Sequence, residues 1–314
     1  KFQPVVAFLS LEIALENQMR TYAGGLGVLA GDLLRSAADV GFPMIGVTLV
    51  NRQGYLKQTI VAGRQVAGAD KWYPERLLKR LNKTVDIEIG RDKVRVGAWQ
   101  YTIETGKIKI PVLLLDTDLP ENKTAYRRLT DNLYAAGQDI RLQQEIILGR
   151  GGVRIIKALG HNKINKYHLN EGHASLAALE LIKQARQNGF ASKLKAVRDK
   201  CVFTTHTPLL GAQDIFRCDF FKTYVPDWPD NLESLFEEGK INLTKVGLHL
   251  SGSVNAVSKK HREVSRLMFP GKTISSITNG VNPSFWTGPE MAKIFDSQAP
   301  GWRRDSRLLV DTSK

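Results

Sequence analysis

The sequence has 314 residues, of which 42% are hydrophobic and 24% charged, and its 45 lysines and arginines against 31 acids give a net charge of +14. This composition excludes an intrinsically disordered chain, which has too few apolar residues to form a core. Apolar runs stay far below the ~18 residues of a membrane-spanning helix. Basic residues are interspersed with acids, so we expect neither a membrane nor a nucleic-acid partner.

The first elements in chain order indicate alternating strands and helices. A continuous apolar run, Val5–Leu9, predicts a buried strand. A glycine-rich turn at Gly24–Gly27 then opens a helix whose apolar residues recur at helical spacing until Gly41. Met44–Val50 predicts the second buried strand, and Tyr55–Ile60 follows a turn as a candidate hairpin strand.

The middle of the chain changes pattern twice. Residues 84–115 alternate apolar and polar side chains, which predicts an antiparallel patch inserted into the α/β core. Residues 137–159 return to helical spacing, and we expect Gly149–Gly152 to break or kink that helix.

The second half repeats strands and helices. Strands are predicted near 167–169, 201–205, 254–257 and 274–277, and helices over 174–188 and 259–267. This alternation predicts an α/β fold with a Rossmann-like, doubly wound, mostly parallel sheet covered on both faces. The segment from Pro289 has no clear core face.

The two cysteines, Cys201 and Cys218, are too few for a secreted disulfide scaffold. We therefore expect reduced thiols and a cytoplasmic protein. The basic first residue, Lys1, is followed directly by a strand-like run, so no signal peptide is expected. Since Lys1 is not a methionine, we expect a processed or partial chain.

The glycine turn at Gly24–Gly27 is the first candidate for chemistry. It precedes a helix whose free N–H groups favour an anion, and glycine lets a phosphate approach the backbone. The alternative is that these glycines only permit close packing. The turn is neither a phosphate-binding P-loop nor the dinucleotide pattern G-x-G-x-x-G.

Polar corners follow several of the predicted strands. Glu171 and His173 come after one strand and His206 after the next. Glu12 ends the first strand and Asn279 the last, although Asn-Gly is also a common turn signal. Ligands bind at the carboxyl ends of strands in open α/β sheets, so these corners predict a pocket. A third metal ligand with zinc-type spacing is not found, and no metal site is predicted.

Taken together, these segments resemble the α-glucan phosphorylase family (glycogen, starch and maltodextrin phosphorylases), most closely its shorter bacterial and archaeal branch. The resemblance rests on Ser10-Leu11-Glu12, Tyr22–Asp32, Arg52–Tyr55, Arg141–Glu145, Leu169–Ala174, Thr204–Pro208, Ser258–His261 and Thr278–Asn282, in the family's order. It implies the N-terminal half of a glycosyltransferase-B fold, with residues 1–285 as a Rossmann-like domain and 286–314 as the start of a second domain. It also implies the cofactor pyridoxal phosphate. The lysine that binds this cofactor lies in the family's C-terminal half, and no segment of this sequence resembles it.

The resemblance further implies reversible phosphorolysis of a terminal α-1,4-linked glucose to glucose 1-phosphate. In that reaction His206 is the catalytic residue and contacts the glucosyl unit. Gly25, Leu26 and Gly27 face the phosphate region, and Glu12, Glu171, His173 and Asn279 bind substrate. Expected partners are an α-1,4-glucan, phosphate and glucose 1-phosphate, with a C-terminal half or a homo-oligomer as further candidates.

Two alternatives stay open at this point. The chain could be a glucan-binding half-protein without catalysis, or a nucleotide-sugar glycogen synthase, which shares the fold and a glycine turn. The sequence also departs from the resembled family at Pro208–Asp214, where the short branch usually has Pro-Ala-Gly-His. That departure leaves the acceptor specificity open.

Overall fold

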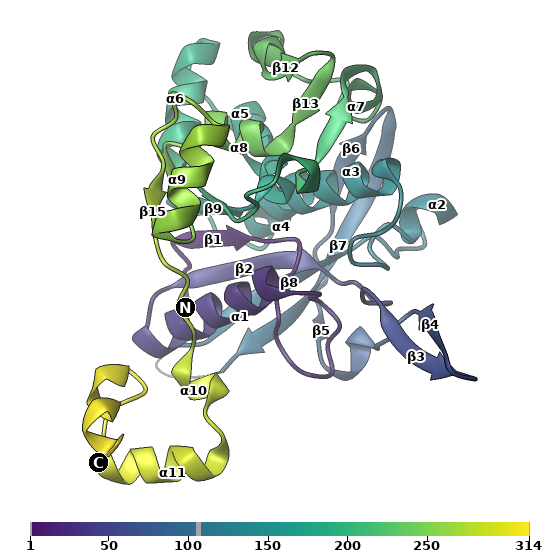
Figure 1. The fold of residues 1–314 in the computed structure, drawn as a ribbon. Coiled ribbons are helices and arrows are strands. Elements are labelled where there is room, and N and C mark those ends of the chain that lie inside the picture. The colour runs from purple at the N-terminus through teal and green to yellow at the C-terminus, as the bar shows by residue number, and fades with distance from the viewer. Residues whose placement is uncertain (1, 105–107, 314) are drawn as a thin grey trace.

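The computed structural model describes residues 2–104 and 108–313, and a large, mostly parallel sheet runs through its centre (Figure 1). Neighbouring strands follow the order β15-β14-β10-β9-β1-β2-β8-β7-β5, with β6 paired to β7. Strands from β15 to β8 run parallel, whereas β7 and β5 extend the sheet antiparallel. This confirms the predicted α/β class with a mostly parallel sheet. The main-sheet strands are β1 (Val6–Leu9), β2 (Met44–Leu49), β5 (Lys79–Arg80), β6 (Val85–Ile89), β7 (Asp92–Ile103), β8 (Ile110–Asp116), β9 (Lys166–Asn170), β10 (Cys201–Thr205), β14 (Ser253–Ala256) and β15 (Ser275–Ser276).

Two hydrophobic cores lie on the two faces of this sheet. Along β1, Ala7 and Leu9 belong to one core and Phe8 to the other. Along β8, Leu113 and Val112 divide in the same way. Successive side chains of a strand point to opposite faces, so an unbroken apolar run is what a strand covered on both sides requires.

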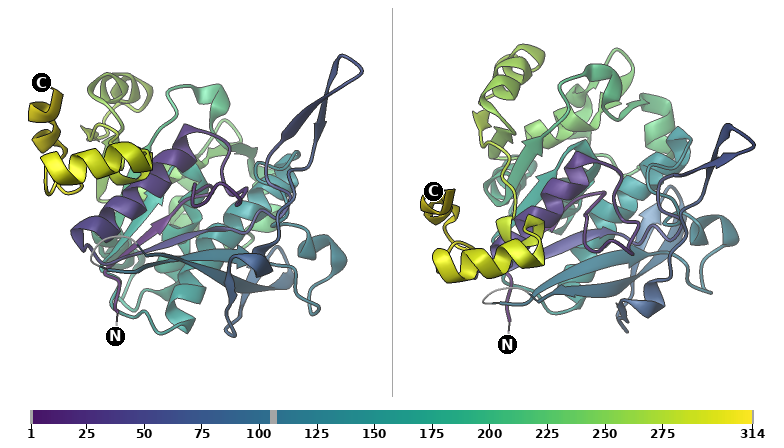
Figure 2. Two further views of the ribbon diagram at one scale, coloured as in Figure 1. Left: turned by 90° about the horizontal axis from the view of Figure 1, so that it is seen from below. Right: turned by 60° about the horizontal axis from the view of Figure 1, so that its bottom comes forward.

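Helices cover both faces (Figures 1 and 2). Helix α1 (Gly25–Val40) contributes Leu34 and Ala38 to the smaller core, and it ends at Gly41, whose φ of 80° suits glycine. The helices that cover the larger core come from the rest of the chain. The remaining helices are α2 (Thr124–Arg127), α3 (Gln138–Ile146), α4 (Gly152–Ala158), α5 (Leu176–Gln184), α6 (Phe190–Lys200), α7 (Cys218–Tyr224), α8 (Leu243–Leu250), α9 (Lys259–Met268), α10 (Pro283–Trp286) and α11 (Pro289–Gln298). Short 3-10 turns lie at Pro74–Arg76, Gly172–Ala174, Leu210–Ala212, Asp230–Leu235 and Ser306–Ser313.

The predicted break or kink at Gly149–Gly152 falls at a change of helix type, and the helix is not broken there. A π-helical segment, Ile147–Gly151, joins α3 directly to α4. Helix α5 packs against this segment so closely that a Cβ on Gly149 would lie 2.6 Å from the backbone nitrogen of Ala177. The glycine is therefore needed for helix packing and does not interrupt the helix.

The predicted antiparallel insertion at 84–115 is only partly correct. β6 and β7 do form an antiparallel pair, and β7 pairs antiparallel with β8. However, β8 also pairs parallel with β2, so it is an inner strand of the main sheet. Its Ile110–Asp116 run is buried throughout, which is typical of an inner strand rather than of a patch with one wet face.

Residues Tyr55–Ile60 do not pair back onto the preceding strand. Instead β3 (Lys57–Val61) pairs with β4 (Arg64–Gly68) in a separate exposed hairpin that projects from the body (Figure 2). A second small sheet, β11 (Ile215–Arg217), β13 (Lys240–Asn242) and β12 (Phe236–Glu237), was not predicted. Its strands are too short to give a periodicity signal.

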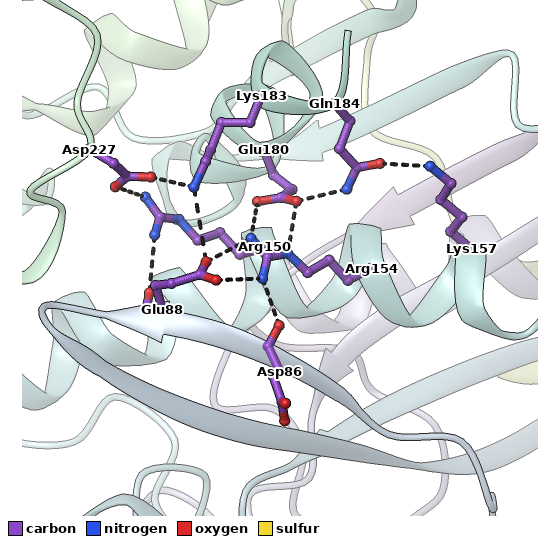
Figure 3. Close-up of polar contacts among 9 residues, drawn as sticks. All are labelled: Asp86, Glu88, Arg150, Arg154, Lys157, Glu180, Lys183, Gln184 and Asp227. Atoms are coloured by element: carbon purple, nitrogen blue, oxygen red, sulfur yellow. Dashed lines mark hydrogen bonds and ion pairs between the residues drawn. The ribbon is translucent and has the colours of Figure 1, made fainter.

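A network of arginines and acids fixes β6 to the helices behind it (Figure 3). Arg154 bonds Glu88 Oε2 at 2.8 Å and Glu180 Oε1 at 2.8 Å. The fully buried Arg150 donates to the carbonyl of Glu88 at 3.0 Å and to Asp227 at 2.6 Å. This network joins β6, the α3–α4 helix, α5 and the Asp227 loop, away from the polar corners of the sheet.

Helix α10 lies beside α1, whereas α11 extends away from the body (Figure 1). Asn282 donates to Asp39 at 2.8 Å, and the indole of Trp286 donates to Asp32 at 2.8 Å. Helix α11 has no buried residue, as its sequence pattern indicated. Among the described residues, no helix has both the length and the apolar character needed to cross a membrane. Cys201 and Cys218 are both free thiols, as predicted.

Candidate active site

The carboxyl ends of the parallel strands meet at one edge of the sheet, and the polar corners predicted from the sequence lie along it. Glu12 follows β1, Glu171 follows β9 and His206 follows β10. β1, β9 and β10 are consecutive neighbours in the sheet. Asn279 comes after β15, two strands beyond β10, and its N–H donates to the carbonyl of Val257 at 3.1 Å.

A cavity of about 290 Å³ opens between this edge and α1. His206 and Asn279 both line it, so the structure brings these two predicted residues together. The other walls come from α1 and from the ends of β9, β10 and β14: Leu29, Asp32, Leu33, Asn170, Thr204 and Asn255. Gly25, Leu26 and Gly27 form the first turn of the same helix but lie outside the cavity lining.

Hydrogen bonds fix the imidazole of His206. Its Nε2 lies 2.7 Å from Asn170 Oδ1, and Asn170 Nδ2 donates to Ser10 Oγ at 3.0 Å. Burial lowers the pKa of His206 to about 4, so the ring is neutral near pH 7. A neutral ring that donates from Nε2 keeps Nδ1 as an acceptor. Asn170, which lies in the predicted polar corner but was given no role from the sequence, therefore sets the orientation and the tautomer of His206.

Glu171 connects the β9 corner to the β10 corner. Its carboxylate accepts hydrogen bonds from the N–H of His206 at 2.8 Å, the N–H of Thr207 at 2.9 Å and the hydroxyl of Thr207 at 2.9 Å. It also accepts from the N–H of Gly172 at 3.1 Å. The backbone of Glu171 has φ 69° and ψ 173°, a conformation that non-glycine residues rarely adopt. The protein itself uses this carboxylate to hold the loop that carries His206.

Glu12 shapes the glycine turn in a similar way. Its Oε2 accepts from the N–H groups of Ala23 at 2.6 Å and Gly24 at 3.2 Å, and Tyr134 donates its hydroxyl to Oε1 at 2.9 Å. A Cβ on Gly27 would lie 2.9 Å from Glu12 Oε2, whereas a Cβ on Gly25 would meet no atom within 4 Å. The turn is thus closely packed on the Gly27 side and open to a ligand on the Gly25 side.

His173 belongs to a buried charged cluster at the same edge. Its Nε2 lies 3.1 Å from Asp214 Oδ2. Arg141 Nε lies 3.1 Å from Asp214 Oδ1 and 3.3 Å from Glu145 Oε1. Burial would raise the pKa of Asp214, but His173 and Arg141 hold it well below its usual value. Burial, followed by the charge of Asp214, raises the pKa of Glu145 well above its usual value.

This cluster also has the spacing of a possible metal site. Ligand atoms of Glu145, His173 and Asp214 lie within 4.8 Å of one another. However, the guanidinium of Arg141 lies against both carboxylates and supplies the positive charge that a cation would bring. The donor set therefore gives no support for a metal.

Several of these residues escaped the sequence reasoning for a physical reason. Asn170, Tyr134 and Asp214 act through hydrogen bonds between segments up to 160 residues apart in sequence, and no spacing rule reports such pairs. Arg141 and Glu145 were part of the family resemblance but carried no predicted role. Their i, i+4 spacing on a helix was the one local signal available.

A mostly parallel sheet that presents polar corners and a glycine turn along one edge is a Rossmann-like arrangement, consistent with a domain of the glycosyltransferase-B type. A family model described as "Starch synthase catalytic domain" matches residues 8–274. The chain belongs to this glycosyltransferase family.

Among curated proteins, the chain is similar to phosphorylases. It is 35% identical to a glycogen phosphorylase of Mycobacterium tuberculosis, over 92% of this chain and 38% of that protein. It is 34% identical to a maltodextrin phosphorylase of Thermococcus litoralis, over 94% of this chain and 38% of that protein. A glycogen phosphorylase of Aquifex aeolicus is 32% identical over 94% of this chain and 46% of its own length. These relatives confirm the resemblance to the phosphorylases, and the chain spans between a third and a half of their length.

Proposed function

We propose that this chain forms the N-terminal wall of an α-glucan phosphorylase, in which a terminal α-1,4-linked glucose is transferred reversibly to phosphate to give glucose 1-phosphate. The observation that supports this most is the cavity shared by His206 and Asn279 beside α1. Residues 286–314 would lead toward a second domain that closes the cleft. Two reduced thiols agree with a cytoplasmic location.

The geometry supports a division of roles among the predicted site residues. His206 and Asn279 would contact the glucosyl unit, because both line the cavity. The neutral imidazole of His206 offers an acceptor to a sugar hydroxyl without adding charge to the site. Glu171 would act as a positioning residue, because its carboxylate is occupied by the His206 loop.

The glycine turn would face the phosphate region. Helix α1 has no acidic residue in its first turn, and the approach at Gly25 is open, so the free N–H groups of Gly25, Leu26 and Gly27 can stabilise an anion. Glu12 would serve the turn by fixing Ala23 and Gly24. His173 would lie toward the acceptor sugar, oriented by Asp214.

Pyridoxal phosphate is the cofactor implied by the phosphorylase relatives. The open anion-favouring turn at Gly25 fits a neighbouring phosphate group. When bound, this cofactor supplies a phosphate that exchanges a proton with substrate phosphate. The residues of this chain would orient the glucosyl unit and exclude water from it.

A second candidate function is glucosyl transfer from a nucleotide sugar. The match to a starch synthase family model favours it, and the glycine turn could equally take a diphosphate. The two functions differ in their glucosyl donor. The third candidate function is glucan binding without catalysis.

The test combines this chain with a C-terminal half that carries pyridoxal phosphate. The first reaction mixture contains maltoheptaose and orthophosphate, and the second contains glucan with ADP-glucose or UDP-glucose. We expect glucose 1-phosphate of retained configuration in the first mixture only. Transfer from a nucleotide sugar would favour the synthase. Calorimetric binding of maltoheptaose without turnover in either mixture would favour the binding role.

A further inference from the structure

A second cavity, of about 340 Å³, lies at the amino edge of the sheet, opposite the polar corners. It is enclosed by the C-terminal ends of α4, α5 and α6 and by Tyr167 at the start of β9. Three cationic side chains line it: Lys157, Arg186 and Lys200. None of the residues that line it is an aspartate or a glutamate.

These cations have few competing partners. Lys157 Nζ reaches Gln184 Oε1 at 3.4 Å, as Figure 3 shows. Within the described part of the chain, no ion pair joins Lys157, Arg186 or Lys200 to a carboxylate. The amides of Asn162, Gln184 and Gln187 line the same cavity and can donate hydrogen bonds to an anion.

Basic residues outnumber acids in the stretch of sequence that supplies most of the cavity walls. Residues 157–200 contain nine lysines and arginines against three acids, a surplus close to half of the net charge of +14. Two of those acids are engaged elsewhere, because Glu171 faces the opposite edge and Glu180 is bonded to Arg154; among the cations, Lys183 is likewise paired with Asp227. The local potential is therefore strongly positive.

Compensation of the helix C-termini is the competing explanation, because basic side chains stabilise the partial negative charge of such ends. Each end carries about half a charge. About one and a half positive charges would therefore compensate the three short helix ends. The cavity is lined by three formal positive charges, and Lys163 and Lys166 are close in sequence to residues that line it. The excess cationic charge, with amide donors around a half-open cavity, is what a small polyanion requires.

We propose that this cavity binds a small phosphorylated anion, at a site separate from the glucosyl cleft. The proposal does not depend on the proposed function. The cavity volume suits a phosphate or diphosphate group with a modest organic substituent. Lys157, Arg186 and Lys200 would hold its oxygens, and the amides would complete the shell.

The test titrates pyrophosphate calorimetrically into the 314-residue protein at low ionic strength. We expect the double variant Arg186→Gln, Lys200→Gln to weaken binding by at least about tenfold, because each removes a charge-assisted contact. The matched control Lys193→Gln, Lys195→Gln removes the same charge from α6 outside the cavity and should change the Kd by less than about twofold.

Four results would overturn the proposal. Pyrophosphate could fail to bind, or both double variants could weaken it equally, which would indicate only a general charge effect. Binding could also survive the cavity variant and be lost in Gly25→Ala, which would assign the anion to the glycine turn. If the cavity variant lowers the melting temperature without changing the Kd, the cations serve only the helix ends.

Discussion

The backbone conformation of Glu171 leads to a prediction about protein stability that its side-chain contacts alone would not suggest. Its φ of 69° and ψ of 173° fall in a region that is essentially restricted to glycine, and its buried carboxylate accepts hydrogen bonds from Gly172, His206 and Thr207. We predict that Glu171→Gly is more stable than Glu171→Ala. This order is the reverse of the usual ranking of alanine over glycine.

The size of the difference follows from two opposing terms. A residue in this conformation costs about 1–3 kcal/mol when it carries a Cβ, and Glu171→Ala keeps that cost whereas Glu171→Gly removes it. Glycine loses about 0.4–1 kcal/mol more through the entropy of the unfolded chain. The net advantage of glycine is therefore about 1 kcal/mol. Both variants lose the carboxylate, so both fall below the wild type by about 2–3 kcal/mol or more.

Urea denaturation followed by tryptophan fluorescence measures these differences. The matched control is Glu263, on the exposed face of α9, where alanine should be more stable than glycine by about 1 kcal/mol. If Glu171→Ala proves as stable as Glu171→Gly, the backbone at this position is not strained and the reasoning fails. In the reconstituted enzyme both Glu171 variants should also lose activity, because the His206 loop loses its anchor; full activity would refute the positioning role.

Three further predictions concern the glycine turn, a buried histidine and a buried acid. The added Cβ of Gly25→Ala meets no protein atom, so this variant should keep its stability while binding glucose 1-phosphate more weakly. The added Cβ of Gly27→Ala meets Glu12, so this variant should lose about 1–3 kcal/mol of unfolding free energy. Equal stability of the two variants in urea denaturation would contradict the packing argument. Burial lowers the pKa of His168 to about 4, so this residue weakens folding as the pH falls from about 6.5 toward 4. His168→Gln should reduce the pH dependence of the urea midpoint in that window, and the dependence that remains comes from groups such as His206, whose pKa is also about 4. Burial would raise the pKa of Asp116, but Arg52 lowers it to about 2. Asp116→Asn should therefore lower the free energy of unfolding by about 2–3 kcal/mol. The control variant Asp305→Asn, at the surface, should leave the urea midpoint unchanged.

Much of the fold could be predicted because local patterns determined it. The runs at β1, β2 and β10 are continuous and apolar, and such runs in a chain with alternating helices are typical of a sheet covered on both faces. The helix after the glycine turn was bounded by Gly24 and Gly41, and both ends agree with the structure. β8 was misassigned to an insertion because pairing partners are not encoded in periodicity, and β8 joins a parallel and an antiparallel neighbour.

The candidate site was predictable in position but not in its internal connections. Strand order places the corners carrying Glu171 and His206 side by side, as the position of each after a strand indicated. The sequence could not show that Glu171 is occupied by the loop of His206, or that Asp214 meets His173. Such contacts depend on how loops close between strands, which no local pattern specifies.

The most direct measurement of the central claim maps where glucose 1-phosphate contacts the isotope-labelled protein by amide chemical shifts. We predict that the perturbed amides gather at the carboxyl edge, at Gly25, His206 and Asn279, and that they return toward their free positions in Asn279→Ala. Perturbations confined to other faces of the sheet, or the same perturbations in Asn279→Ala, would show that these strand ends do not form one wall of a sugar site.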